Sequence, residues 1–182
     1  MRRSISMLLT FILVLCLSVS CGKEEKDTPE KDCRTALEEW FKDMNDPDAG
    51  YDYYKEMLPA ELFSHLEEKE LLDVRIEYFR TSTEEQQSSY KEIPSFSKIT
   101  SSDALSDDEL KRAETYFADL SCYRYSYLLG EVKAEKGYEI DFRYTDENNK
   151  SASSVVCAVK LKGDGWKIIN TDSDDMFYSA GR

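Results

Sequence analysis

In the first half of the chain, apolar residues recur at the three- and four-residue spacing that is typical of helices. Three helices are predicted there: residues 33–45 behind an Asp32 N-cap, residues 51–58, and a third that begins at Pro59. Residues 71–79 fit both a helical stripe and a strand pattern, and flanks rich in Glu, Lys and Gln favour a helix. Residues 81–90 then read as a polar connection.

The second half of the chain changes to the two-residue period of strands. Residues 95–101 predict a short first strand, and Ser106 with Glu109 predicts a capping box that opens a helix. Strand-like runs follow at residues 123–132, 138–145, 155–161 and 166–170, joined by turn-forming residues at 135–137, 146–150 and 162–165. Helices followed by strands with short turns predict an α+β fold, with N-terminal helices packed on one face of a curved antiparallel sheet.

The first twenty residues carry a pattern of their own. Arg2 and Arg3 precede an uncharged, mostly apolar run over residues 7–17, and small residues then lead to Cys21. A basic start, a short apolar run and a small-residue exit are the three parts of a secretory signal. The apolar run is too short to cross a bilayer, which takes about 20 residues. Residues 1–20 are therefore predicted to be a signal peptide.

Residues 17–22, with the sequence LSVSCG, resemble the lipobox of bacterial lipoproteins. In that class a diacylglyceryl group is attached to the cysteine thiol and a peptidase cuts the chain just before it. The lipobox usually has Leu three residues before the cysteine, where this chain has Ser18. The resemblance implies palmitate-type acyl chains on Cys21 that hold the protein to the cell membrane at its extracytoplasmic face. An ordinary secreted protein is the alternative.

Residues 21–31 are expected to be the lipid-bearing cysteine and a flexible tether, because no large apolar side chain follows Cys21 there. Residues 32–182 have the length of one ordinary domain. The formal net charge of the whole chain is −13, and it becomes more acidic once the two signal-peptide arginines are removed. Such a charge argues against nucleic acid as a partner and against flat binding to anionic lipid. No cofactor is expected.

The order of helices and strands, together with the closing turn over residues 162–168 (KGDGWKI), resembles the nuclear-transport-factor-2-like fold. That fold is a cone made by a curved sheet over helices, and the likeness is to small domains of unknown function in Firmicute-type lipoproteins. A cystatin-like fold has nearly the same element order and is the alternative. Neither fold would by itself imply a function.

Three cysteines remain after Cys21 in the sequence. Cys157 lies on the apolar phase of a strand pattern and is expected to be a buried free thiol. Cys33 and Cys122 each lie near the edge of a predicted element, and an exported protein can form disulfides. A Cys33–Cys122 bridge is therefore a hypothesis, although the sequence cannot fix the connectivity.

No residue set forms a catalytic or metal-binding signature. His65 is the only histidine, and no second soft ligand is spaced near it, so a structural or surface role is expected. The acidic residues 43–52 suggest calcium, but no register places oxygen ligands and glycine as an EF-hand loop requires. We therefore expect a helix-breaking turn there and no metal site.

Tyrosine is the one residue type used unusually often, with twelve in the chain. The favoured interpretation is that the tyrosines are core residues of the sheet. A concave aromatic face could instead line a pocket for a small apolar or aromatic ligand. The candidate ligand-binding residues would then be Tyr125, Tyr127, Tyr138, Phe142 and Tyr144.

These patterns predict a lipid-anchored extracytoplasmic domain that binds a small ligand or an envelope protein without catalysis. One alternative is a cone-fold enzyme that uses a cavity carboxylate such as Asp141 as a base, although Asp141 falls on the phase opposite Ile140 and Phe142. Another is a structural or assembly accessory of the envelope. A cavity with a buried carboxylate would favour the enzyme, whereas an exposed apolar patch would favour a partner site.

Overall fold

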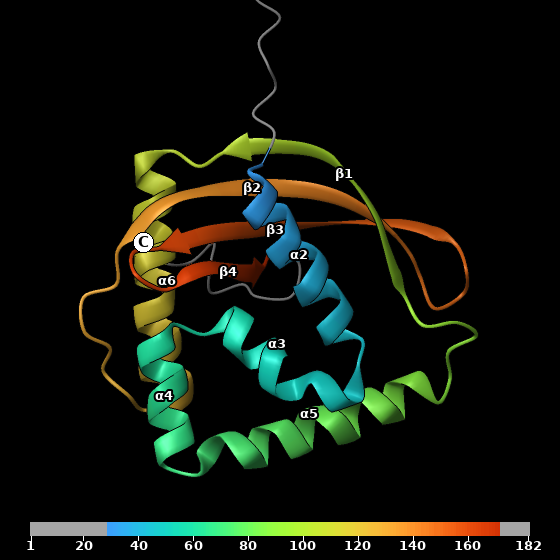
Figure 1. The fold of residues 1–182 in the computed structure, drawn as a ribbon, viewed down its shortest axis with the longest axis horizontal. Coiled ribbons are helices and arrows are strands. Elements are labelled where there is room, and N and C mark those ends of the chain that lie inside the picture. The colour runs from blue at the N-terminus through green and yellow to red at the C-terminus, as the bar shows by residue number, and fades with distance from the viewer. Residues whose placement is uncertain (1–28, 172–182) are drawn as a thin grey trace, which may run out of the picture.

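The computed structural model describes residues 29–171, so the expected signal peptide, Cys21 and most of the tether lie outside the described residues. The elements of the described part are α2 (Lys31–Met44), the 3₁₀ turn η1 (Pro47–Ala49), α3 (Gly50–Met57), α4 (Ala60–Glu68), α5 (Leu71–Gln87), β1 (Ser95–Ala104), α6 (Asp107–Tyr125), β2 (Ala134–Thr145), β3 (Ser151–Leu161) and β4 (Gly165–Asn170) (Figure 1). Within these residues no helix combines the length and the apolar character needed to cross a membrane.

The four strands form one antiparallel sheet in the order β1-β2-β3-β4, so every strand pairs with its neighbours along the chain. The sheet is curved, and in Figure 1 α2 crosses its front face while α5 runs below β4 and α3. The predicted α+β fold with a curved antiparallel sheet is therefore confirmed.

The central strand β3 is buried on both faces. Val156 and Ala158 pack with residues of α2, whereas Cys157 and Val159 pack with residues of α4, α5 and α6. The expectation that helices cover only one face of the sheet is thus wrong. The sequence carries the reason, because residues 155–159 form a continuous apolar run, as strands covered on both faces do.

The predicted strand over residues 123–132 is also wrong. Residues 123–125 are the last turn of α6, and residues 126–133 form no helix or strand. The predicted capping box of Ser106 and Glu109 does open α6. The helix ends where Ser126 adopts φ 53°, with backbone bonds from Ser126 to Cys122 and from Tyr127 to Ser121. The bond from Ser126 to Cys122, with Ser126 in the left-handed region, is the αL type of C-cap, and it ends the helix before the tyrosine alternation can form a strand.

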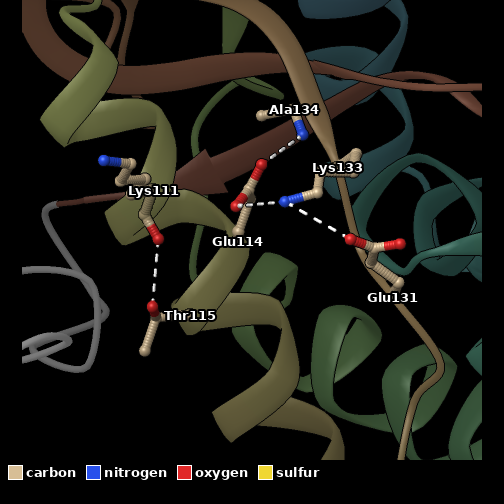
Figure 2. A network of polar contacts seen from close by, with 6 residues as sticks. All are labelled: Lys111, Glu114, Thr115, Glu131, Lys133 and Ala134. Carbon is tan, nitrogen blue, oxygen red and sulfur yellow. Dashed lines mark hydrogen bonds and ion pairs between the residues drawn. The ribbon is translucent and has the colours of Figure 1, made fainter.

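Two carboxylates hold the irregular segment 126–133 in place. Glu61 of α4 accepts hydrogen bonds from the Tyr127 hydroxyl at 2.9 Å and from the backbone N–H of Gly130 at 3.2 Å. Glu114 of α6 accepts the Ala134 N–H at 3.0 Å, and Lys133 lies 3.7 Å from its other oxygen (Figure 2). Side chains therefore satisfy backbone groups that no neighbouring strand pairs.

Most other elements differ from the predictions only at their ends. Helix α5 runs to Gln87, through most of the predicted polar connection, and β2 begins at Ala134, so the turn predicted at residues 135–137 is strand. A Cβ at Gly137 would lie 2.9 Å from the Ala158 carbonyl oxygen, which explains a glycine inside the strand. Glu30 takes the N-cap position of α2, and Asp32 lies in the first turn.

The turn between β3 and β4, predicted correctly, is tied to two helices through Asp164. One carboxylate oxygen accepts the Ala60 N–H at the start of α4 at 2.6 Å, and the other lies 2.9 Å from Lys167 Nζ. Lys167 Nζ also donates to the Lys55 carbonyl of α3 at 2.8 Å. The side chains of Lys167 and Asp164 are only 5% and 15% exposed, so each charge depends on the other.

Replacing Asp164 with alanine should therefore lower the free energy of unfolding by about 3 kcal/mol. The change leaves the buried ammonium of Lys167 without its carboxylate and the Ala60 N–H at the start of α4 without its acceptor. Urea denaturation of the wild type and the variant measures this. The matched control is Asp103→Ala on the exposed end of β1, which should change stability by less than about 0.5 kcal/mol. Equal losses in the two variants would contradict the role given to Asp164.

Candidate functional site

A hollow of about 670 Å³ lies between α2, α3 and the β3–β4 hairpin. We call it the acidic cleft. Its lining residues are Asp32, Thr35, Ala36, Glu39, Lys42, Asp43, Asp52, Lys55, Glu56, Asp164, Trp166 and Lys167. The three walls come from segments that pack on one another, so the cleft exists only in the folded chain.

Carboxylates outnumber cations in the acidic cleft, with six acidic side chains against three lysines. The lysines are largely engaged with the protein. Lys167 is held by Asp164 and the Lys55 carbonyl, and Lys42 lies 3.8 Å from Asp43. The acidic groups contributed by α2 and α3 therefore dominate the charge that a ligand would meet.

Glu56 of α3 is the acidic residue of the cleft whose pKa is raised most clearly. Burial, together with the nearby carboxylates of Asp43, Glu39 and Asp52, raises its pKa to about 8 against the opposing effect of Lys167. Its Oε2 atom is buried, and no residue between 29 and 171 offers it a hydrogen bond. Burial likewise raises the pKa of Asp43, where Lys42 opposes the shift. Much of Glu56 is thus protonated at neutral pH.

Trp166 forms an aromatic wall of the same cleft. Its ring stacks on Tyr138 at a centroid distance of 5.9 Å, and its buried Nε1–H has no hydrogen-bond partner in the described part of the chain. The lining of the cleft therefore combines carboxyl groups with an aromatic ring. Such a set can hold a cation by charge, hydrogen bonding and ring contact.

The predicted aromatic ligand-binding residues do not meet in one place. Tyr138 and Tyr144 pack at the α2 side of the sheet with Phe142, whereas Tyr125 lies beneath Arg75, whose guanidinium is 4.2 Å from its ring centroid. Tyr127 stacks on His65 at 4.0 Å. The prediction of one aromatic face is therefore wrong, because residues 123–127 are the helix end and its exit. Phe142 and Tyr144 do line a smaller hollow.

Cys33, Cys122 and Cys157 are all free thiols in the structure, so the expected Cys33–Cys122 bridge is not formed. Cys33 is buried in the apolar cluster beneath α2, and Cys122 is exposed at the end of α6. Burial raises the pKa of Cys33 to about 12 and that of Cys157 to about 12. The prediction of a buried free Cys157 is confirmed, and both buried thiols are poor nucleophiles.

The other candidate groups lie apart from the cleft or hold no ion. Asp141 is exposed on β2 and accepts a hydrogen bond from Ser101, so it cannot act as a base in the cleft. Residues 43–52 form the end of α2, η1 and the start of α3, the helix-breaking turn that was expected, with Asp46 accepting the Asp48 N–H. Across residues 29–171, no group of three or more His, Cys, Asp or Glu side chains could hold a metal ion.

An exposed apolar stripe runs along the outer side of α5. Leu71, Val74 and Tyr78 are 46%, 69% and 75% exposed, although their spacing is that of one helix face. This is the kind of surface that favours a protein partner. The stripe is separate from the residues that line the acidic cleft.

Glu56 and Lys167 were not singled out from the sequence. Glu56 is one of many acidic residues on predicted helices, and its burial depends on the hairpin that packs beside it. For Lys167 a signal existed, since a lysine between Trp166 and Ile168 in a mostly apolar strand is unusual.

Comparison with known protein families, with curated proteins and with solved structures finds no match to this chain. The likeness to nuclear-transport-factor-2-like domains therefore stays a prediction.

Glu56 should make stability depend on pH. Because its pKa in the folded chain, about 8, lies above the ordinary value of 4.5, the folded state keeps a proton between these pH values that the unfolded state has lost. The stability that protonated Glu56 contributes to the folded state is fully present below about pH 4.5 and is lost as the pH rises through about 8. We expect Glu56→Gln to gain stability relative to the wild type across this window, as measured by urea denaturation from pH 5 to pH 9.

The control for this titration is Glu39→Gln, which removes a carboxylate from the exposed rim of the same cleft. It should show much less of the pH-dependent gain. A Glu56→Gln curve parallel to that of the wild type would contradict the buried, protonated Glu56.

Proposed function

We propose that this chain is a lipid-anchored extracytoplasmic binding domain that holds a cationic, amine-bearing ligand in the acidic cleft. The observation that carries the proposal is Glu56, whose Oε2 is buried without a partner in the described residues and lies in a field of other carboxylates. The carboxylates of the cleft repel one another, and a bound ammonium group would be attracted by all of them. It would also give Glu56 the hydrogen-bond donor that it lacks.

Binding of an ammonium in this position couples to a proton. At neutral pH Glu56 is largely protonated, and a bound cation favours its ionised form, so the ligand displaces the proton. Trp166 supports the same ligand class, because its ring forms a wall of the cleft and an aromatic face attracts a cation.

The anchoring part of the proposal rests on the N-terminal sequence. The tether would reach the folded domain at the start of α2, where Asp32 already belongs to the rim of the cleft. Lys136 of β2 forms an ion pair with Glu30 and fixes this entry point to the sheet. Lipid on Cys21 would thus hold the mouth of the cleft close to the chain's membrane attachment, within the reach of a short tether.

Proton transfer in the same cleft is a second candidate function. The observation in its favour is the pKa of Glu56 of about 8, which lies near the value that suits a general acid or base at neutral pH. Glu56 would then replace Asp141 as the cavity carboxylate of an enzyme. Binding is the better supported reading, because no nucleophile or second proton carrier with a defined hydrogen bond to Glu56 occurs among residues 29–171.

Putrescine, a four-carbon diamine, should bind the purified protein, whereas the neutral diol of the same length, 1,4-butanediol, should not. Titration calorimetry in buffers of different ionisation enthalpy should show proton release, and added salt should weaken binding. Glu56→Gln should weaken binding about tenfold, as expected for loss of one charge-assisted hydrogen bond.

The control is Asp103→Asn, which removes one negative charge on β1, the sheet edge opposite β4. Affinity that falls equally in both variants would reduce the effect to net charge and contradict a site at Glu56. Proton spectra of the diamine that change on prolonged incubation would favour the enzyme instead.

Intact mass spectrometry of membrane-extracted protein should show a chain that begins at Cys21 and carries acyl groups. Cys21→Ala should lose the added mass and leave the membrane fraction, because the acyl chains supply the anchor. A wild-type protein that retains residues 1–20, or one that partitions like the variant, would contradict the anchoring part of the proposal without bearing on the cleft.

A further inference from the structure

A second hollow, which we call the aromatic pocket, lies on another face of α2 and has a volume of about 290 Å³. Its lining residues are Trp40, Phe41, Met44, Asn45, Pro94, Phe142, Tyr144, Glu147, Ser154 and Asn170. It shares no residue with the acidic cleft. The size is at the lower end for ligand pockets and suits one ring with one small polar group.

Two residues that line this pocket carry a polar atom that is buried without a hydrogen-bond partner among residues 29–171. One atom is the Nε1–H donor of Trp40, a side chain that is only 2% exposed, and the other is the Oδ1 acceptor of Asn170 at the end of β4. Buried polar groups are nearly always paired, because an unpaired one loses its hydrogen bonds to water and forms none in the protein, which destabilises the fold. Residues that line one small hollow thus supply a donor and an acceptor that both lack a partner, and a ligand that pairs with both would satisfy them.

The remaining walls are aromatic and apolar. Phe41 meets Phe142 edge to face at a centroid distance of 5.6 Å and lies 5.3 Å from Tyr144. Glu147 is the only charged residue in the lining, and no cation is present there to balance an acidic ligand. A third hollow, of about 450 Å³, adjoins the aromatic pocket and shares Phe41, Asn45 and Pro94 with it. It leaves room for a substituent on the ligand's ring.

We propose that the aromatic pocket binds a small, uncharged aromatic compound that carries an amide-type group. The ligand's carbonyl oxygen accepts the hydrogen bond of Trp40 Nε1–H, and its N–H donates to Asn170 Oδ1. The ring lies among Phe41, Phe142 and Tyr144, which gives the apolar part of the contact. This site is additional to the cation site in the acidic cleft and does not depend on it.

The chain offers a built-in reporter for each site, because its only two tryptophans are Trp40 and Trp166 and each lines one hollow. In the full chain with Trp166→Phe, the single indole N–H resonance belongs to Trp40. Benzamide is the probe, and toluene is the matched control that keeps the ring and lacks the amide.

Benzamide should shift the Trp40 indole resonance in a ¹H–¹⁵N spectrum in a saturable way, and toluene should bind more weakly. Asn170→Leu, which keeps the side-chain shape, should weaken benzamide binding about two- to tenfold and leave toluene binding unchanged. In the wild type, nuclear Overhauser contacts should join benzamide protons to the rings of Phe142 and Tyr144. These contacts test the site even if Asn170→Leu folds poorly.

A Trp40 resonance that does not respond to millimolar benzamide would overturn the inference. Equal binding of benzamide and toluene, unaffected by Asn170→Leu, would also overturn it, since the pocket would then be an apolar cavity only. A benzamide response seen only at Trp166, in Trp40→Phe, would place the compound in the acidic cleft and overturn the assignment. Failure of putrescine to bind would leave all of these outcomes unchanged.

Discussion

The double burial of β3 is the constraint on which the rest of the structure depends. In its apolar run, the side chains on both faces of the strand are apolar, so both faces must be covered to shield them from water. Helix α2 covers one face, and α6 with α4 and α5 covers the other. The buried side chains Val156, Ala158, Cys157 and Val159 thus join two apolar clusters into one domain.

The position of α2 over the sheet creates both hollows. One face of the helix, with Asp32, Glu39 and Asp43, forms a wall of the acidic cleft, while Trp40 and Phe41 form a wall of the aromatic pocket. A single helix held by the burial of β3 therefore presents two chemically different surfaces. This explains how a domain of ordinary size can carry two separate candidate sites on one rigid element.

Buried charge at the β3–β4 turn fixes the shape of the acidic cleft. Asp164 links the turn to α4, and Lys167 links β4 to α3, so the cleft's walls are joined by hydrogen bonds as well as apolar packing. Glu56 differs from this pair because it has no such partner for Oε2 within the described chain. The paired charges of Asp164 and Lys167 therefore belong to the framework of the fold, whereas the unpaired carboxyl group of Glu56 marks the candidate site.

Local rules in the sequence determined much of the fold. The helical stripes of the first half, the capping box at Ser106 and the turns at residues 146–150 and 162–165 depend on near neighbours, and they appear where expected. The signal peptide, the lipid on Cys21 and the tether stay predictions that are drawn from the N-terminal sequence alone. The tyrosine alternation at residues 123–127 misled, because a strand and a helix end can share such a short pattern.

Only the tertiary structure decided which polar groups lie in a site. Trp40 lies in α2 and Glu56 in α3, whereas Trp166 and Asn170 lie in β4 at the other end of the described chain. What sets these side chains apart is a polar atom buried without a partner among the described residues. Burial and partnership are properties of the packed chain, so no pattern of near neighbours could reveal them. The sequence by itself determined most of the elements, because they depend on near neighbours, and the packing of α2 on a doubly covered strand decided where the candidate sites lie.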